Sequence, residues 1–190
     1  MASAGAVRSE TGFSNGALGM WLFLASEAML FGALFSGYAL LRTGAAAWPA
    51  ASSRLSLPLA GVNTLVLMAS SVTMMGAVRA ARDRNARQAR LAILLTMTLG
   101  VTFLAIKGFE WVAHVRAGEI PATDTFFAIY YTLTGVHALH IAGGLCALAW
   151  LLAAPPPEAN ANASRVPLVG LYWQFVDVVW LLLFTTVYLL

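Results

Sequence analysis

Five long apolar stretches dominate the sequence, and each is long enough to cross a lipid bilayer as a helix. They cover roughly residues 17–41, 57–78, 91–115, 125–152 and 167–190, and about 20 helical residues suffice for one crossing. No segment alternates polar and apolar residues over the roughly 10 residues that a membrane β-strand needs. The sequence therefore predicts an all-α membrane protein, a bundle of five transmembrane helices.

The composition excludes a soluble globular or disordered protein. Charged residues make up 10% of the 190 residues and apolar residues 60%, whereas ordinary soluble domains carry about 25% charged residues. No basic stripe with interleaved aromatic residues is present, which argues against a nucleic-acid partner. We expect a cytoplasmic N-terminal segment over 1–16 and a single five-helix membrane domain over 17–190.

Arginine residues are distributed unequally between the two ends of the predicted bundle. The end that carries the N-terminus collects seven of them, namely Arg8, Arg79, Arg82, Arg84, Arg87, Arg90 and Arg165, and the other end has three, Arg42, Arg54 and Arg116. Because cytoplasmic loops carry the excess of positive charge, the N-terminus is predicted in the cytoplasm and the C-terminus on the outer side. The first stretch is too long for a cleavable signal peptide.

A small set of polar side chains lies inside these stretches at a similar predicted depth. At a rise of 1.5 Å per helical residue, four of them fall in the cytoplasmic half of the membrane or near its middle: Glu27, His137, His140 and Asp177. Gln174 lies one helical turn from Asp177. Unsatisfied polar groups are costly in hydrocarbon, so we expect some of them to meet as a hydrogen-bonded layer. Its role stays open between helix packing and direct handling of protons.

Two further pairs lie three residues apart. Lys107 and Glu110 fall near the outer end of the third stretch, where we expect a local ion pair with stems that reach toward the interface. His137 and His140 suggest a metal or haem, but two ligands on one helix face cannot sandwich a haem, and His114 is predicted near the opposite surface. We therefore expect this chain to bind no haem or metal.

Small and polar residues predict close helix packing. On the first stretch the small residues lie four apart, as Ala28 with Gly32 and Ala33 with Gly37, a spacing that lets another helix approach. On the second stretch, hydrogen bonds to neighbouring helices are expected from Asn63, Ser70, Ser71 and Thr73. The single cysteine, Cys146, is expected in the core as a small apolar residue.

Several separated stretches resemble subunit III of haem-copper oxidases. They are Trp21 to Phe31 with its Ser26-Glu27 pair, Phe126-Phe127 followed by Leu133 to His140 and Gly143, Tyr172 to Trp180, and Leu104 to Trp111. These motifs occur in the family's order and spacing and touch nearly every predicted span. The family's membrane-embedded carboxylate corresponds to Glu27, its paired histidines to His137 and His140, and its late aspartate to Asp177.

The resemblance implies a subunit that binds no haem or copper and packs on subunit I of a respiratory oxidase, with subunit II in the same complex. Haem and copper are then expected in the partner subunits, and phospholipid on this chain. The complex passes electrons from cytochrome c or quinol to oxygen and translocates protons. Its subunit III supports proton uptake, oxygen access and sustained turnover.

Two departures from the family and several alternatives remain. Many members have seven helices with a lipid-filled cleft, whereas this chain matches only the last five, a form found in bacterial oxidases; this favours the bacterial inner membrane. Gln174 stands where the family commonly has His.

The alternatives are a quinol oxidase subunit III, an accessory subunit of a nitric oxide reductase, and a small proton-coupled transporter using Glu27 and Asp177. Accessory subunits of nitric oxide reductases tend to lack the Ser26-Glu27 pair. For the transporter, no inverted repeat is evident.

Overall fold

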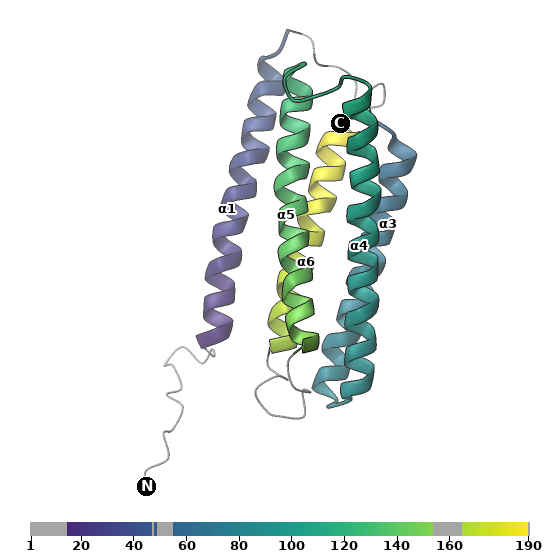
Figure 1. Ribbon diagram of the computed structural model, residues 1–190. Helices are drawn as coiled ribbons and strands as arrows, with labels where there is room; N and C mark the ends of the chain where they lie inside the picture. Colours follow the sequence, from purple (N-terminus) through teal and green to yellow (C-terminus); the bar gives the residue numbers. More distant parts are fainter. Residues whose placement is uncertain (1–14, 47, 49–54, 154–164, 190) are drawn as a thin grey trace.

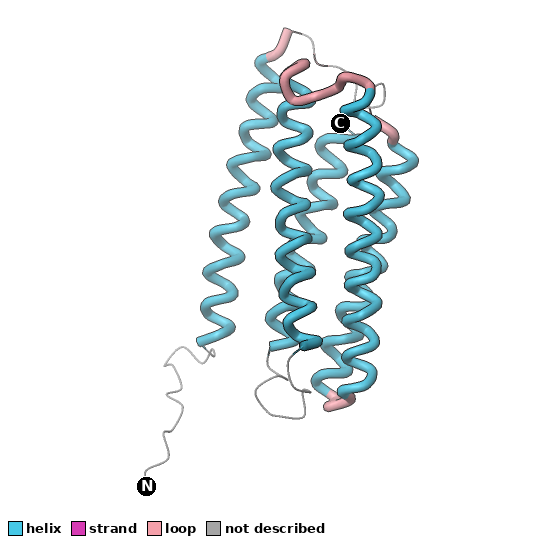
Figure 2. Tube along the Cα trace, viewed as in Figure 1, coloured by secondary structure: helices cyan, strands magenta, loops and turns pink. Residues whose placement is uncertain are grey.

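A computed structural model describes residues 15–46, 48, 55–153 and 165–189 (Figure 1). Within them lie the helices α1 (Asn15–Gly44), α3 (Leu57–Arg82), α4 (Ala86–Arg116), α5 (Thr125–Ala153) and α6 (Arg165–Phe184), followed by the short π-helix η1 (Thr185–Leu189). Five spans, the last formed by α6 with η1, are long and apolar enough to cross a membrane. The described part of the chain contains helices and loops but no strand (Figure 2).

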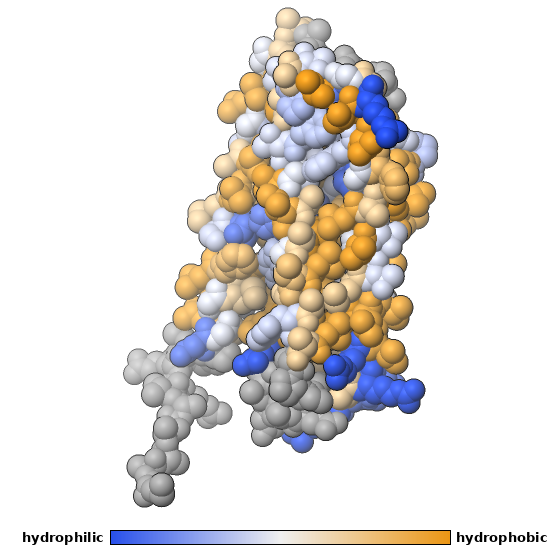
Figure 3. Space-filling view, in the orientation of Figure 1, coloured by the Kyte–Doolittle hydropathy of each residue, from blue (hydrophilic) through white to orange (hydrophobic). Residues whose placement is uncertain are grey.

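The predicted fold class is confirmed, and the helices extend beyond most of the predicted apolar stretches. The third helix, for example, begins at Ala86 rather than 91, because the Asn85 side chain caps it by accepting a hydrogen bond from the Gln88 amide at 3.1 Å. The predicted N-terminal segment 1–16 lies almost wholly outside the described residues, as does Leu190. Polar residues gather at the two ends of the molecule and apolar ones cover much of the face between (Figure 3).

The helices run up and down, side by side, with α1 at the edge of the bundle (Figure 1). α3 and α4 pack closely together, and α6 contacts α3 and α5. α1 packs mainly against α6 and, to a smaller extent, against α5. α1 is the least buried of the five spans. Its buried residues, Leu24, Phe31 and Tyr38, follow a spacing of seven, so α1 is attached along one narrow seam.

The indole of Trp173 on α6 fills the centre of the bundle. It is fully buried, and its Nε1 donates a hydrogen bond to Ser70 Oγ of α3 at 3.0 Å. A methyl group added at Gly100 on α4 would lie 2.7 Å from the indole, and one at Gly144 on α5 would lie 2.9 Å from it. The two glycines therefore make room for one side chain that joins four helices.

The packing predictions have mixed outcomes. On α3 the polar residues bond to other helices as expected: Asn63 donates to the Phe103 carbonyl at 3.3 Å and the hydroxyls of Thr73 and Thr96 lie 2.8 Å apart. On α1 the small-residue prediction is not confirmed for its glycines, because nothing lies near the space of a side chain at Gly32 or Gly37.

The placement of Cys146 in the core is wrong, because its side chain is exposed on α5. The sequence does not distinguish the two placements, because a small apolar residue suits a lipid-facing position as well as a core position.

Gly100→Ala is expected to lower the free energy of unfolding by about 1–3 kcal/mol, because the added methyl group overpacks a rigid indole. The matched control is Gly108→Ala on the same helix, where a side chain meets open space; it should be neutral or slightly stabilising, since alanine favours helix over glycine. Thermal unfolding in detergent, followed by circular dichroism, measures both. Equal losses in the two variants would contradict this account of Trp173.

Candidate functional site

Glu27 and His140 meet where α1 lies against α5. Glu27 Oε2 is 2.7 Å from His140 Nε2, and the two side chains are 16% and 15% exposed. From the end of the bundle that carries the N-terminus, Glu27 is about 18 Å along α1 and His140 about 20 Å along α5, at 1.5 Å per residue. The contact thus joins two helices at the depth that the sequence predicted for both residues.

The hydrogen bonds of His140 show that the pair shares one proton. Its Nδ1 is 2.7 Å from the Val136 carbonyl oxygen, which can only accept, so Nδ1 carries a proton. The bond between Nε2 and Glu27 then needs one more proton, held either by the carboxyl or by the imidazole. If that proton leaves, a lone pair of Nε2 faces a carboxylate and the attraction is lost.

Aromatic residues frame this pair. The Phe31 ring lies edge-on to the His140 imidazole, with 5.0 Å between the ring centres. Tyr172 on α6 donates a hydrogen bond to the His140 backbone carbonyl at 3.0 Å. Three helices therefore hold the imidazole in position.

His137 does not join the Glu27–His140 pair. It is 1% exposed and lies between the rings of Phe103 and Trp180, with centre distances of 5.7 and 5.1 Å. Neither ring nitrogen has a hydrogen-bond partner among the described residues. His137 and His140, although three residues apart, thus face different surroundings.

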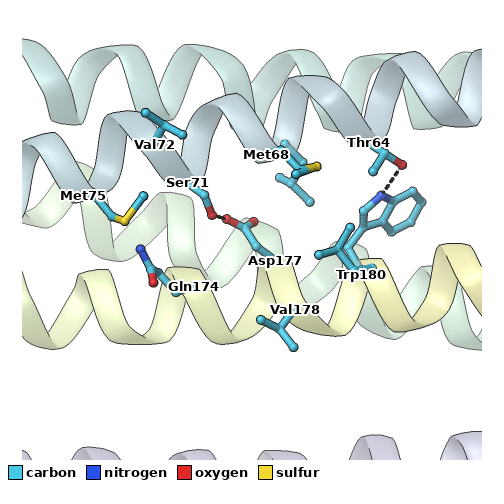
Figure 4. Close-up of a pocket in the computed structure, with 11 residues that line it drawn as sticks. Thr64, Met68, Ser71, Val72, Met75, Gln174, Asp177, Val178 and Trp180 are labelled. Carbon is cyan, nitrogen blue, oxygen red and sulfur yellow. Dashed lines mark hydrogen bonds between the residues drawn. The ribbon is translucent and has the colours of Figure 1, made fainter.

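Asp177 forms a separate site between α6 and α3. Its Oδ2 accepts a hydrogen bond from the Ser71 hydroxyl, and no bond links it to Glu27 or either histidine in the described part of the chain. Gln174, one turn earlier, lines the same cavity (Figure 4). Of the residues expected to meet, the structure brings together Glu27 and His140, while Asp177 bonds to Ser71 and His137 has no hydrogen-bond partner among the described residues.

A third polar cluster joins Lys107 and Glu110 of α4 to Tyr130 of α5 and Tyr188 of η1. Lys107 Nζ donates to Glu110 Oε2 at 2.9 Å and to the Tyr130 hydroxyl at 3.2 Å, and it also contacts the Tyr188 hydroxyl. Both tyrosine hydroxyls donate to Glu110 Oε1 at 2.8 Å. Charges balance and each of the ionised groups is bonded, so this cluster is closed and structural in character.

The expectation that the stems of Lys107 and Glu110 reach toward the interface is wrong. The two residues are 2% and 4% exposed, and Lys107 Nζ lies 4.8 to 5.2 Å from the centres of the Tyr130, Trp180 and Tyr188 rings. The aromatic rings and the tyrosine hydroxyls replace the solvent that the ammonium group would otherwise seek. Sequence reasoning missed both tyrosines, because they are 20 and 78 residues from Glu110.

His114 lies at the other end of the bundle, as predicted, with its Nδ1 2.6 Å from Glu119. Among the described residues, no group of three or more His, Cys, Asp or Glu side chains is placed to hold a metal ion.

The fold and these sites define a multi-pass helical membrane protein with polar contacts deep between its helices. Comparison with known sequences gives its family: residues 6–190 match cytochrome c oxidase subunit III, and the chain belongs to this family. The predicted resemblance is therefore confirmed, and the chain is a subunit III of the haem-copper oxidase type.

The alignments with curated relatives cover most of this chain and most of each relative. Cytochrome c oxidase subunit 3 of Bacillus sp. (strain PS3) is 34% identical over 93% of this chain and 86% of the relative. A probable cytochrome c oxidase subunit 3 of Nocardia farcinica is 36% identical over 90% and 86%. The cytochrome bo(3) ubiquinol oxidase subunit 3 of Pseudomonas aeruginosa is 32% identical over 93% and 85%.

Glu110→Ala is expected to cost about 3–5 kcal/mol of folding free energy, because it leaves a buried ammonium group without its counter-ion. A double variant, Lys107→Met with Glu110→Leu, should recover much of that loss, since an apolar pair needs no compensation. Unfolding in detergent micelles measures both. The control is Glu119→Ala, which removes a partly exposed contact with His114 and should cost less than about 1 kcal/mol. A similar loss in the control would contradict the closed cluster.

Proposed function

We propose that this chain is the non-catalytic subunit III of a respiratory oxidase, that it packs on subunit I, and that it supports proton uptake, oxygen access and sustained turnover. Subunit II is part of the same complex. Haem and copper belong to the partner subunits, and this chain binds neither. The family match supports this proposal at the level of the complex, and the Glu27–His140 contact supports it at the level of the residues.

The Glu27–His140 contact carries the proposal because it depends on one proton at membrane depth. Both side chains are partly accessible, so the proton can exchange with groups beyond this chain. When the Glu27–His140 pair holds this proton, a short hydrogen bond attaches α1 to α5. When the pair loses the proton, that hydrogen bond is lost. Glu27 and His140 thereby link the protonation of the subunit to the attachment of its least buried helix.

The remaining polar residues have different proposed roles. Asp177 and Gln174 belong to the α3–α6 cavity, while His137 fixes helix packing beside Trp180. Lys107 and Glu110 hold the C-terminal η1 in place. Phospholipid is proposed between α1 and α6, where an apolar cavity of about 440 Å³ includes Trp21, Leu24 and Phe175 in its lining.

Glu27→Ala is expected to leave the initial oxygen consumption of the complex mostly intact but to shorten its active lifetime or change its pH dependence. Glu27→Gln is the sharper variant: its amide can donate to His140 Nε2 but does not ionise, so lifetime should be retained while the pH dependence changes. Oxygen-electrode traces across pH measure both quantities.

The control is Ser26→Ala, at an exposed neighbour whose hydroxyl bonds only within α1, to the Phe23 carbonyl at 2.7 Å. It should match the parent. If Glu27→Ala also matches the parent in lifetime at every pH, the proposed role of the pair is wrong.

We also propose that the N-terminus faces the cytoplasm of a bacterium, with the protein in the inner membrane. The loop between α3 and α4 would then be cytoplasmic and the loop between α4 and α5 external. In a Cys146→Ala background, a membrane-impermeant maleimide added to intact cells should label Ala122→Cys but not Arg84→Cys. Inverted vesicles should reverse this pattern, and labelling of Arg84→Cys in intact cells would overturn the orientation.

A further inference from the structure

A cavity of about 290 Å³ opens between α3 and α6 on the side of the bundle (Figure 4). Most of its lining is apolar, and Met68 and Met75 of α3 and Trp180 of α6 belong to it. Its polar groups are few: Asp177 and Gln174 from α6, and Ser71 from α3. A concave, mostly apolar space with a few converging polar groups has the general form of a small-molecule site.

The polar groups of this cavity have unused hydrogen-bonding capacity. Asp177 is 7% exposed; Ser71 bonds to its Oδ2, and its Oδ1 has no partner among the described residues. The Gln174 amide, which points toward α3 in Figure 4, has no hydrogen bond to the described part of the chain either. A buried acceptor left unpaired is unfavourable, so a ligand that forms a hydrogen bond with it is favoured.

Depth restricts which ligand can reach Asp177. The residue is twelve positions into α6, about 18 Å from the helix end at 1.5 Å per residue, close to the middle of a hydrocarbon layer about 30 Å thick. A phospholipid phosphate stays at the interface and does not reach this level. The ligand must therefore carry an uncharged hydrogen-bonding group that resides within the hydrocarbon layer.

The lining further restricts the shape of that group. Methionine side chains adapt to a flat aromatic ring and make favourable sulfur contacts with it, and the indole of Trp180 offers a second flat surface. Asp177 and Gln174 lie one helical turn apart, so one ring can meet both. From this arrangement we propose that the α3–α6 cavity binds a membrane-soluble molecule of the quinol class, with a ring hydroxyl donating to Asp177 Oδ1 and the hydrocarbon tail leaving through the side opening.

The proposal concerns binding alone and is independent of the function proposed above. Gln174 contributes by accepting from or donating to a second ring oxygen, since an amide can do both. Ser71 bonds to Oδ2 of the Asp177 carboxyl, which leaves Oδ1 without a partner among the described residues.

The test uses membranes that contain the chain together with its partner subunits. The probe is an azido-substituted ubiquinone analogue with a decyl tail, activated by light after reduction to the quinol, and labelled peptides are found by mass spectrometry. We expect labels on the α3 and α6 segments that line the cavity, and competition by excess decylubiquinol. Equally strong competition by dodecanol or by phosphatidylglycerol would show a non-specific apolar groove and would overturn the proposal. Crosslinking of a partner subunit's helix to this place would overturn it as well.

Variants make the assignment specific. Asp177→Leu should lower labelling about tenfold, the loss expected for one buried hydrogen bond. Val72 is a 63% exposed residue of the lining. Val72→Trp should fill the cavity and lower labelling equally, while the Asp177–Ser71 bond stays in place. This variant therefore tests the proposal even if Asp177→Leu fails to fold. The matched control is Leu139→Trp, at a 73% exposed residue outside the cavity. Unchanged labelling in Val72→Trp, or equal loss in Leu139→Trp, would overturn the proposal.

Discussion

Hydrocarbon offers no hydrogen bonds, and this constraint determines how the helices of the protein are joined. A polar side chain inside a span must find its partner within the protein. Trp173 meets Ser70, Trp180 Nε1 donates to Thr64 Oγ1 at 2.9 Å, and Thr73 meets Thr96. Each of these bonds crosses from one helix to another. Lipid tails are as apolar as leucine, so such bonds and close packing, rather than burial of apolar surface, select which helices associate.

The polar sites differ in how completely they meet this requirement, and the difference separates structural from functional candidates. The Lys107–Glu110 cluster has balanced charges and is buried, and both of its ionised groups are hydrogen-bonded, so it offers no unpaired group to a ligand. The Glu27–His140 bond is complete only when one exchangeable proton is present. Asp177 keeps one oxygen without a partner in the described structure. His137 also lacks hydrogen-bond partners in the described structure, but it is enclosed, at 1% exposed. Glu27 and His140 are partly exposed and Asp177 lines a cavity, so these three residues are the ones that other molecules can approach.

The sequence predicts the spans well because each depends on a long local run of apolar residues. Depth also follows from counting along a helix, which is why Glu27 and His140 were expected at one level. The direction in which a residue faces is harder to predict, because lipid and protein interior are both apolar: Cys146 faces outward and Lys107 inward, contrary to expectation. The Tyr188 contact with Glu110 depends on how η1 packs against α4, and no local pattern encodes it.

The position of Glu27 supports the role proposed for its proton in the subunit. α3, α4, α5 and α6 are joined around Trp173, whose hydrogen bond to Ser70 involves no acidic or basic side chain. α1 lies outside this arrangement. Besides its narrow apolar seam, its polar attachments in the described structure include Glu27 to His140 and Tyr38, whose hydroxyl donates to the Thr186 carbonyl at 2.7 Å. Loss of the Glu27–His140 bond thus weakens the attachment of α1 while the other helices keep their packing. A change of this kind affects how long a complex remains active more than whether its subunit folds.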